Sequence, residues 1–128
     1  MSVVKSSPEI SKMLAGEPYI ALEDPVMLKL KMRARNLQRQ LNEYPVAKYF
    51  DGMKPQDTFG DEGKYSLIAQ LFDIPLERAK KLFIEPPFYC DHGVFIEFKG
   101  EFYCNYNTTI LDCNKVTIGD RVSFGMSY

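Results

Sequence analysis

Four polar side chains in the last third of the sequence are candidates for chemistry: Asp91, His92, Asn105 and Asp112. His92 is the only histidine, the residue type best suited to accept a proton near neutral pH. No second general-base partner is visible for it. A structural or loop role is the first interpretation, and contact with a bound substrate or service as a replacement base are the alternatives. Asp91 and Asp112 lie near expected turns, where carboxylates often accept backbone hydrogen bonds.

The three cysteines restrict the chemistry further. Cys90, Cys104 and Cys113 are odd in number, and their spacing fits no zinc pattern. We therefore expect no metal and predict reduced, buried thiols in a cytoplasmic protein. The N-terminus lacks the apolar stretch of a secretory signal, and no apolar run is long enough to span a membrane. A net charge of −1 gives no reason to expect nucleic acid or an anionic membrane as a partner.

A six-residue period near the end of the sequence must position these side chains. Apolar residues recur at that interval and, after a slip of two residues, resume it: Phe98, Cys104, Ile110, Ile118 and Phe124. This pattern indicates a parallel β-helix, in which each coil is built from short strands. Such a coil needs about three or more stacked repeats and a cap. The sequence offers four or so short repeats before Tyr128, so we expect only the first, incomplete coils. Asn105 and Asn107 are suited to coil corners, where left-handed backbone occurs.

The first part of the sequence has helical patterns instead. The longest begins at the N-cap Asp24 with Pro25 behind it, and Pro45 stops it. Its apolar stripe predicts packing against a neighbouring surface. Shorter helices are expected over 8–15, 65–72 and 76–83, with a Gly-, Pro- and Asp-rich loop over 51–63.

From Ile84 onward, β-branched and aromatic residues dominate. We therefore predict an α+β fold in two parts, a helical cap over residues 1–83 and the start of a β-helix over residues 84–128. The cap is expected to shield the open end of the first coil, where unpaired backbone and apolar side chains would otherwise be exposed.

Several phrases resemble, in the same order, those of the maltose and galactoside O-acetyltransferase family, within the hexapeptide-repeat acyltransferases. They are Lys12–Tyr19 (K-M-x-A-G-E-x-Y), Arg33–Asn42 (R-A-R-x-L … N), Glu85–Gly93 (E-P-P-F-x-C-D-Y-G), Phe102–Asn107 (F-Y-x-N-x-N) and Leu111–Asp120 (L-D … V-x-I-G-D). The resemblance covers about residues 12–125. It implies a left-handed β-helix and a homotrimer with active sites between subunits. The implied reaction transfers acetyl from acetyl-CoA to the hydroxyl of a maltose- or galactoside-like sugar.

The resemblance also assigns roles to individual positions. Asp91, Asn105 and Asp112 stand at or next to acceptor-binding positions. Some members carry a second acid where this sequence has Cys113. Another acceptor-contacting position is Ala21 here, and Glu23 could substitute for it.

The largest departure from the family pattern is the missing catalytic histidine. The family carries it in a T-x-x-H-P phrase after the strand that corresponds to Phe124–Gly125, and its acetyl-CoA cleft is formed by later coils. We therefore expect no catalytic residue in these 128 residues, no identifiable cofactor-binding residue, and little or no turnover. The alternative interpretation is a non-enzymatic relic or protein-interaction module that binds through an open β edge.

Overall fold

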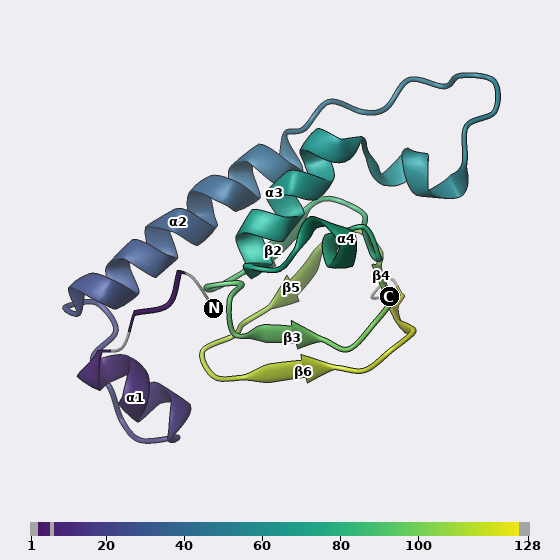
Figure 1. Ribbon diagram of the computed structural model, residues 1–128. Coiled ribbons are helices and arrows are strands. Elements are labelled where there is room, and N and C mark those ends of the chain that lie inside the picture. Colours follow the sequence, from purple (N-terminus) through teal and green to yellow (C-terminus); the bar gives the residue numbers. More distant parts are fainter. Residues whose placement is uncertain (1–2, 6, 126–128) are drawn as a thin grey trace.

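Helices occupy the first part of the chain and short strands the second, in a computed structural model that describes residues 3–5 and 7–125 (Figure 1). The helices are α1 (Pro8–Leu14), α2 (Pro25–Asn42), the 3-10 helix η1 (Pro55–Phe59), α3 (Glu62–Phe72) and α4 (Leu76–Ala79). The strands are β1 (Leu82–Ile84), β2 (Phe88–Cys90), β3 (Ile96–Phe98), β4 (Phe102–Cys104), β5 (Thr108–Ile110), β6 (Val116–Ile118) and β7 (Val122–Phe124). In the described part of the chain, no helix combines the length and apolarity that crossing a membrane would require.

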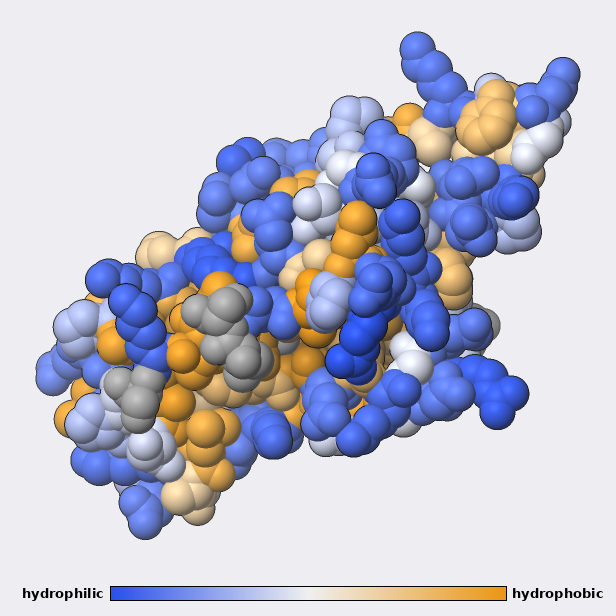
Figure 2. Space-filling model, in the orientation of Figure 1, coloured by the Kyte–Doolittle hydropathy of each residue, from blue (hydrophilic) through white to orange (hydrophobic). Residues whose placement is uncertain are grey.

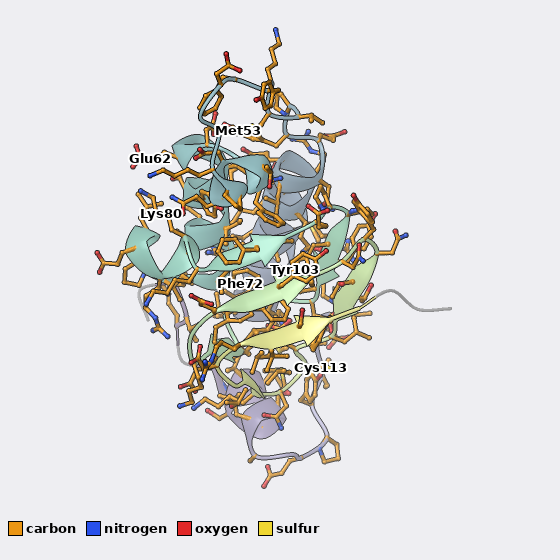
Figure 3. The ribbon with its side chains drawn as sticks, turned by 90° about the vertical axis from the view of Figure 1, so that its right-hand side faces the viewer. Met53, Glu62, Phe72, Lys80, Tyr103 and Cys113 are labelled. Carbon is orange, nitrogen blue, oxygen red and sulfur yellow. The ribbon has the colours of Figure 1, made fainter. Side chains whose placement is uncertain are left out.

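The strands wind into a parallel β-helix with three faces. β1, β4 and β7 pair on one face, β2 and β5 on the second, and β3 and β6 on the third. Every pair joins residues twenty apart, as in Leu82 with Phe102 and Phe102 with Val122. Figure 3 shows the first face as three stacked arrows, with Tyr103 on the middle one. The six-residue period therefore correctly predicted parallel coils.

Side chains at the third position of the strands fill the interior. Those of the first six strands are all buried: Ile84, Cys90, Phe98, Cys104, Ile110 and Ile118. The spacing lengthens from six to eight residues between Ile110 and Ile118, as the sequence predicted. It lengthens in the same way between Cys90 and Phe98, a slip that the sequence analysis missed.

Phe72 at the end of α3 closes one end of this interior. Its ring lies 4.9 Å from that of Phe98 and 5.7 Å from that of Phe88, both edge-on. The side chain is 1% exposed and belongs to the same core as the inward residues of α2. The apolar stripe of α2 therefore packs against a neighbouring surface, as predicted, and α3 fills the space between that stripe and the first coil.

Two amide side chains of α2 form hydrogen bonds with backbone N–H and C=O groups of β2. Gln38 accepts a hydrogen bond from the Cys90 N–H at 2.9 Å and donates to its carbonyl at 3.0 Å. Asn42 does the same for Phe88, at 2.9 Å and 3.0 Å. Four residues of helix rise about 6.0 Å, close to the roughly 6.6 Å between alternate residues of a strand. The expectation that the helical part shields the first coil is confirmed on this face.

The predicted helix over 76–83 is wrong beyond its first turn. α4 ends at Ala79, and β1 begins at Leu82 because residues 82–84 pair with residues 102–104. Phe83 does not point inward, since its ring packs on Phe59 of η1 at 5.2 Å. The predicted loop over 51–63 also contains η1 and the start of α3, whose N-cap is Asp61.

Candidate functional site

The polar residues singled out in the sequence lie at the corners between strands. Residues 85–87 and 105–107 form the first corner, where the Asn107 N–H donates to the Pro87 carbonyl at 3.1 Å. Residues 91–95 and 111–115 form the second corner, and residues 99–101 and 119–121 the third. Asn107 adopts a left-handed φ of 62°, as its type allows, whereas Asn105 is not left-handed.

Asp112 organises the second corner from inside. Its Oδ1 accepts from the His92 N–H at 2.8 Å, and its Oδ2 accepts from the Phe95 N–H at 3.2 Å. The residue is completely buried. Burial raises the pKa of Asp112, and the two amide hydrogen bonds oppose that shift. The carboxylate therefore fixes the turn that carries Asp91, which confirms the expectation that Asp112 accepts backbone hydrogen bonds at a turn. Its predicted contact with an acceptor stays a prediction.

His92 is held inside the same corner. Its Nδ1 lies 3.1 Å from the Asp112 carbonyl oxygen, which can only accept, so Nδ1 carries the proton. Its Nε2 is buried and has no hydrogen-bond partner among the described residues. The ring is 3% exposed and stands edge-on to Phe95 at 5.4 Å. This geometry favours the structural interpretation of His92 over a replacement base, because the unprotonated nitrogen does not face solvent.

The loop between α1 and α2 covers the second corner. Its residues Tyr19 and Ala21 pack against a cluster formed by Ile10, Met13, Met27, Leu30, Val94 and Phe95. Burial raises the pKa of Tyr19, and the nearby Cys113 and Asp91 raise it further. Tyr19 thus lies on the second corner, near enough to Asp91 and Cys113 for their charges to act on its hydroxyl. The motif that ends at Tyr19 gives no sign, in the sequence, that this residue lies near Asp91. Glu23 lies exposed in the same loop.

The first corner carries Asn105 in a different polar setting. The Asn105 Oδ1 accepts from the Tyr106 N–H at 2.8 Å, and its own N–H donates to the Phe124 carbonyl at 3.0 Å. A hydrogen bond to Glu85 raises the pKa of the Tyr106 hydroxyl. Burial lowers the pKa of Lys64, and the negative charge of Glu85 opposes that shift. The interaction between Tyr106 and Glu85 in the corner that carries Asn105 was not found from the sequence.

The three predicted site residues therefore divide between two corners. Asp91 and Asp112 share the second corner, whereas Asn105 lies on the first, with strands β2 and β5 between them. A three-residue strand alone spans roughly 10 Å. Asp91 and Asn105 therefore lie at opposite ends of one face of the coil, separated by the length of a strand.

The three thiols differ in accessibility, contrary to the prediction that all are buried. Cys90 and Cys104 are buried, but Cys113 is exposed because it lies in the second corner outside any strand. Burial raises the pKa of Cys90 strongly and that of Cys104 to about 11. We expect a coloured disulfide reagent to titrate one thiol quickly in the folded protein and three after unfolding. Rapid reaction of any thiol in folded Cys113→Ser would contradict this.

Comparisons with known proteins bear on this arrangement. Residues 12–73 match the family model of the maltose acetyltransferase hexapeptide capping motif. A galactoside O-acetyltransferase of Escherichia coli is 43% identical over 61 residues, which are 48% of this chain and 29% of that protein. A maltose O-acetyltransferase structure from Clostridium difficile has a TM-score of 0.66 at 26% identity, covering 93% of this chain and 55% of that one.

A second solved structure was determined with a ligand bound. It is a hexapeptide-repeat-containing acetyltransferase from Vibrio cholerae, in complex with acetyl coenzyme A, with a TM-score of 0.62 at 25% identity. The match covers 92% of this chain and 55% of that one. The chain spans about half the length of the curated relatives that it matches along most of its own length.

A helical cap joined to parallel coils of twenty residues defines a hexapeptide-repeat acetyltransferase fold. Within that class, residues 12–73 carry the capping motif of maltose acetyltransferases, and the chain is similar to maltose and galactoside O-acetyltransferases.

Proposed function

We propose that this chain supplies the cap and the first coils, left-handed, of an acetyl-CoA-dependent O-acetyltransferase whose acceptor is a sugar hydroxyl of maltose or galactoside type. The observation that carries the proposal is the joining of the cap motif to the second corner. The loop between α1 and α2, which includes Tyr19, packs on Val94 and Phe95, and this packing places Tyr19 near Asp91. A tyrosine ring near a half-buried carboxylate is suited to bind a sugar, which presents both an apolar face and hydroxyl groups.

The proposed roles follow from the chemistry of each group. Asp91 accepts hydrogen bonds from acceptor hydroxyls, while Asp112 beneath it holds the turn in place. Asn105 provides an amide at the other corner. In acetyl transfer the acceptor hydroxyl attacks the thioester carbonyl, loses its proton to a base, and displaces the coenzyme as a thiol. Asp91 and Asn105 would orient the hydroxyl for that attack.

A homotrimer accounts for the division of the site. If the second corner of one copy faces the first corner of the next, Asp91 and Asn105 meet across the interface. In a cyclic assembly, each contact joins two different surfaces, and the ring closes. The exposed thiol of Cys113 fits a reducing cytoplasm as the place where the protein works.

The proposed acceptor site can be tested by binding alone. We expect Asp91→Ala to abolish calorimetric binding of maltose and a β-galactoside to the protein. The control is Asp120→Ala, which removes a carboxylate from the third corner. Equal binding by Asp91→Ala and the wild type would remove Asp91 from the site, and wild-type protein that binds neither sugar would contradict the proposed acceptor class.

Acetyl transfer by the 128 residues alone is expected to be absent or very slow. The only histidine is buried, with Nδ1 committed to the Asp112 carbonyl. Loss of a general base typically costs about 10²–10⁴-fold. The assay measures thiol release from acetyl-CoA with and without acceptor sugar, in a Cys113→Ser background to remove the protein's reactive thiol. Acceptor-dependent release above that of heat-denatured protein would show that another base acts.

One observation favours the alternative of an interaction module. Val122 and Phe124 of β7 are only partly buried although their strand pairs with β4. A strand that pairs along this edge would cover them. Light scattering that shows oligomers growing with concentration supports this alternative, whereas a single defined mass counts against it.

A further inference from the structure

The chain between α2 and η1 forms an arm, residues 45–54, that projects from the molecule. It leaves the upper end of α2 and turns back toward α3 only after a wide excursion (Figure 1). Val46 is 91% exposed and Tyr49 79%, and Phe50 is also exposed. Figure 2 shows apolar atoms among the charged ones on this projection. Three large apolar side chains so close in sequence exceed the scattered apolar residues expected on a monomer surface.

The arm is attached beside the first corner. Asn42, three residues before it, bonds to the backbone of Phe88 at the end of that corner. On the far side of the arm, Asp61 accepts a 2.6 Å hydrogen bond from the Tyr44 hydroxyl, which closes its base. The arm therefore extends beyond the corner that carries Asn105.

A second set of exposed apolar side chains surrounds the second corner. Leu22 is 72% exposed and Ile20 55%, both in the loop that places Tyr19 near Asp91. Leu111, 62% exposed, immediately precedes Asp112. We call these three residues the corner patch. It borders one half of the proposed acceptor site, as the arm borders the other half.

The arm and the corner patch cannot meet within one chain. The loop with Ile20 and Leu22 precedes α2, and the arm follows α2, whose eighteen residues are about 27 Å long. Figure 3 agrees, with Met53 of the arm near the top of the molecule and Cys113 of the second corner in its lower half.

We infer that the arm of one copy packs on the corner patch of the next, so that its apolar side chains border the acceptor site formed between them. The inference rests on the proposed function, because a site divided between Asp91 and Asn105 is complete only when two copies bring these corners together. The same approach places an arm against a corner patch. Two different apolar surfaces of one chain thereby cover each other, which is a heterologous contact.

The native thiol at the second corner allows a direct test. Tyr49→Cys places a thiol on the arm, and we expect a short bis-maleimide to join it to Cys113 of another copy, giving covalent dimers and larger species on a denaturing gel. Wild-type protein and Tyr49→Cys/Cys113→Ser each lack one of the two thiols and should give none. Met32→Cys, on a 49% exposed position of α2, is the matched control. Absence of the cross-link, equal cross-linking of Met32→Cys, or a product within one chain would overturn the inference.

Substitution of the arm provides a second measurement. Val46→Ser/Tyr49→Ser/Phe50→Ser should convert the assembly to monomers in sedimentation, while Met32→Ser should not. An unchanged mass would contradict the arm contact and would point to assembly through β7. If Tyr49→Cys gives no cross-link but the protein still binds sugar in an Asp91-dependent way, the inferred arm contact is wrong and the proposed function stands. If Tyr49→Cys is cross-linked to Cys113 of another copy but sugar binding does not depend on Asp91, the arm contact is supported and the proposed function is wrong.

Discussion

Asp112→Ala is expected to lower the free energy of unfolding by about 2–5 kcal/mol. The substitution leaves two buried donors, the His92 and Phe95 N–H groups, without their acceptor. Each buried donor left unsatisfied costs about 1–3 kcal/mol, and removal of a carboxylate that burial disfavours offsets part of the sum. Urea denaturation, compared with wild type and with Asp120→Ala at the exposed third corner, measures the difference. A loss no larger than that of Asp120→Ala would show that the second corner does not depend on this carboxylate.

Asp112→Asn distinguishes the acceptor role from simple filling of space. An asparagine has nearly the same volume, but only one of its two terminal atoms accepts. Its amide nitrogen would face either the His92 or the Phe95 N–H, donor against donor. We expect it to lie between wild type and Asp112→Ala in stability. Wild-type stability for Asp112→Asn would mean that one of the two hydrogen bonds contributes nothing.

Gln38→Leu is expected to lower the free energy of unfolding by about 2–4 kcal/mol, although leucine is well suited to a buried helix position. The change removes the partner of both the N–H and the carbonyl of Cys90. Gln38 is 6% exposed, so water does not readily replace it. The amide hydrogen of Cys90 should also exchange faster, which NMR can follow residue by residue.

Gln40→Leu is the matched control for Gln38→Leu. It changes the same residue type two positions further along α2, on a different side of the helix. If both variants lose equal stability, the cost arises from the glutamine-to-leucine change itself and not from the backbone of β2.

The β-helix could be predicted from the sequence because its period is carried by single inward positions such as Phe98 and Cys104. The slip between Cys90 and Phe98 was missed because Val94 and Phe95 are as apolar as the inward residues. They are buried not in the coil but against α1 and α2. The last turn assigned to α4 failed for a related reason, since Leu82 and Phe83 suit a helix or a strand, and pairing with β4 decides.

The candidate site was predictable only in part. The Asp91 and Asn105 positions follow from family motifs, but the sequence does not reveal that they lie on different corners. That Asp112 points inward could not be read from its neighbours either, since an aspartate at a turn can bond outward or inward. Tyr19 and Cys113 are 94 residues apart in the chain, and only the packing of the α1–α2 loop brings them together.

Because every strand pair joins residues twenty apart, the β-helix can be lengthened in register only by whole coils of twenty residues. Because all three faces repeat with the same pitch, residues 102–121 act like the unit cell of a one-dimensional crystal. A duplicated cell would continue every ladder in phase. A single inserted residue within a strand would instead shift everything after it and turn inward side chains outward. We expect smaller changes to be tolerated best at the second corner, where five residues separate consecutive strands and the other corners have three.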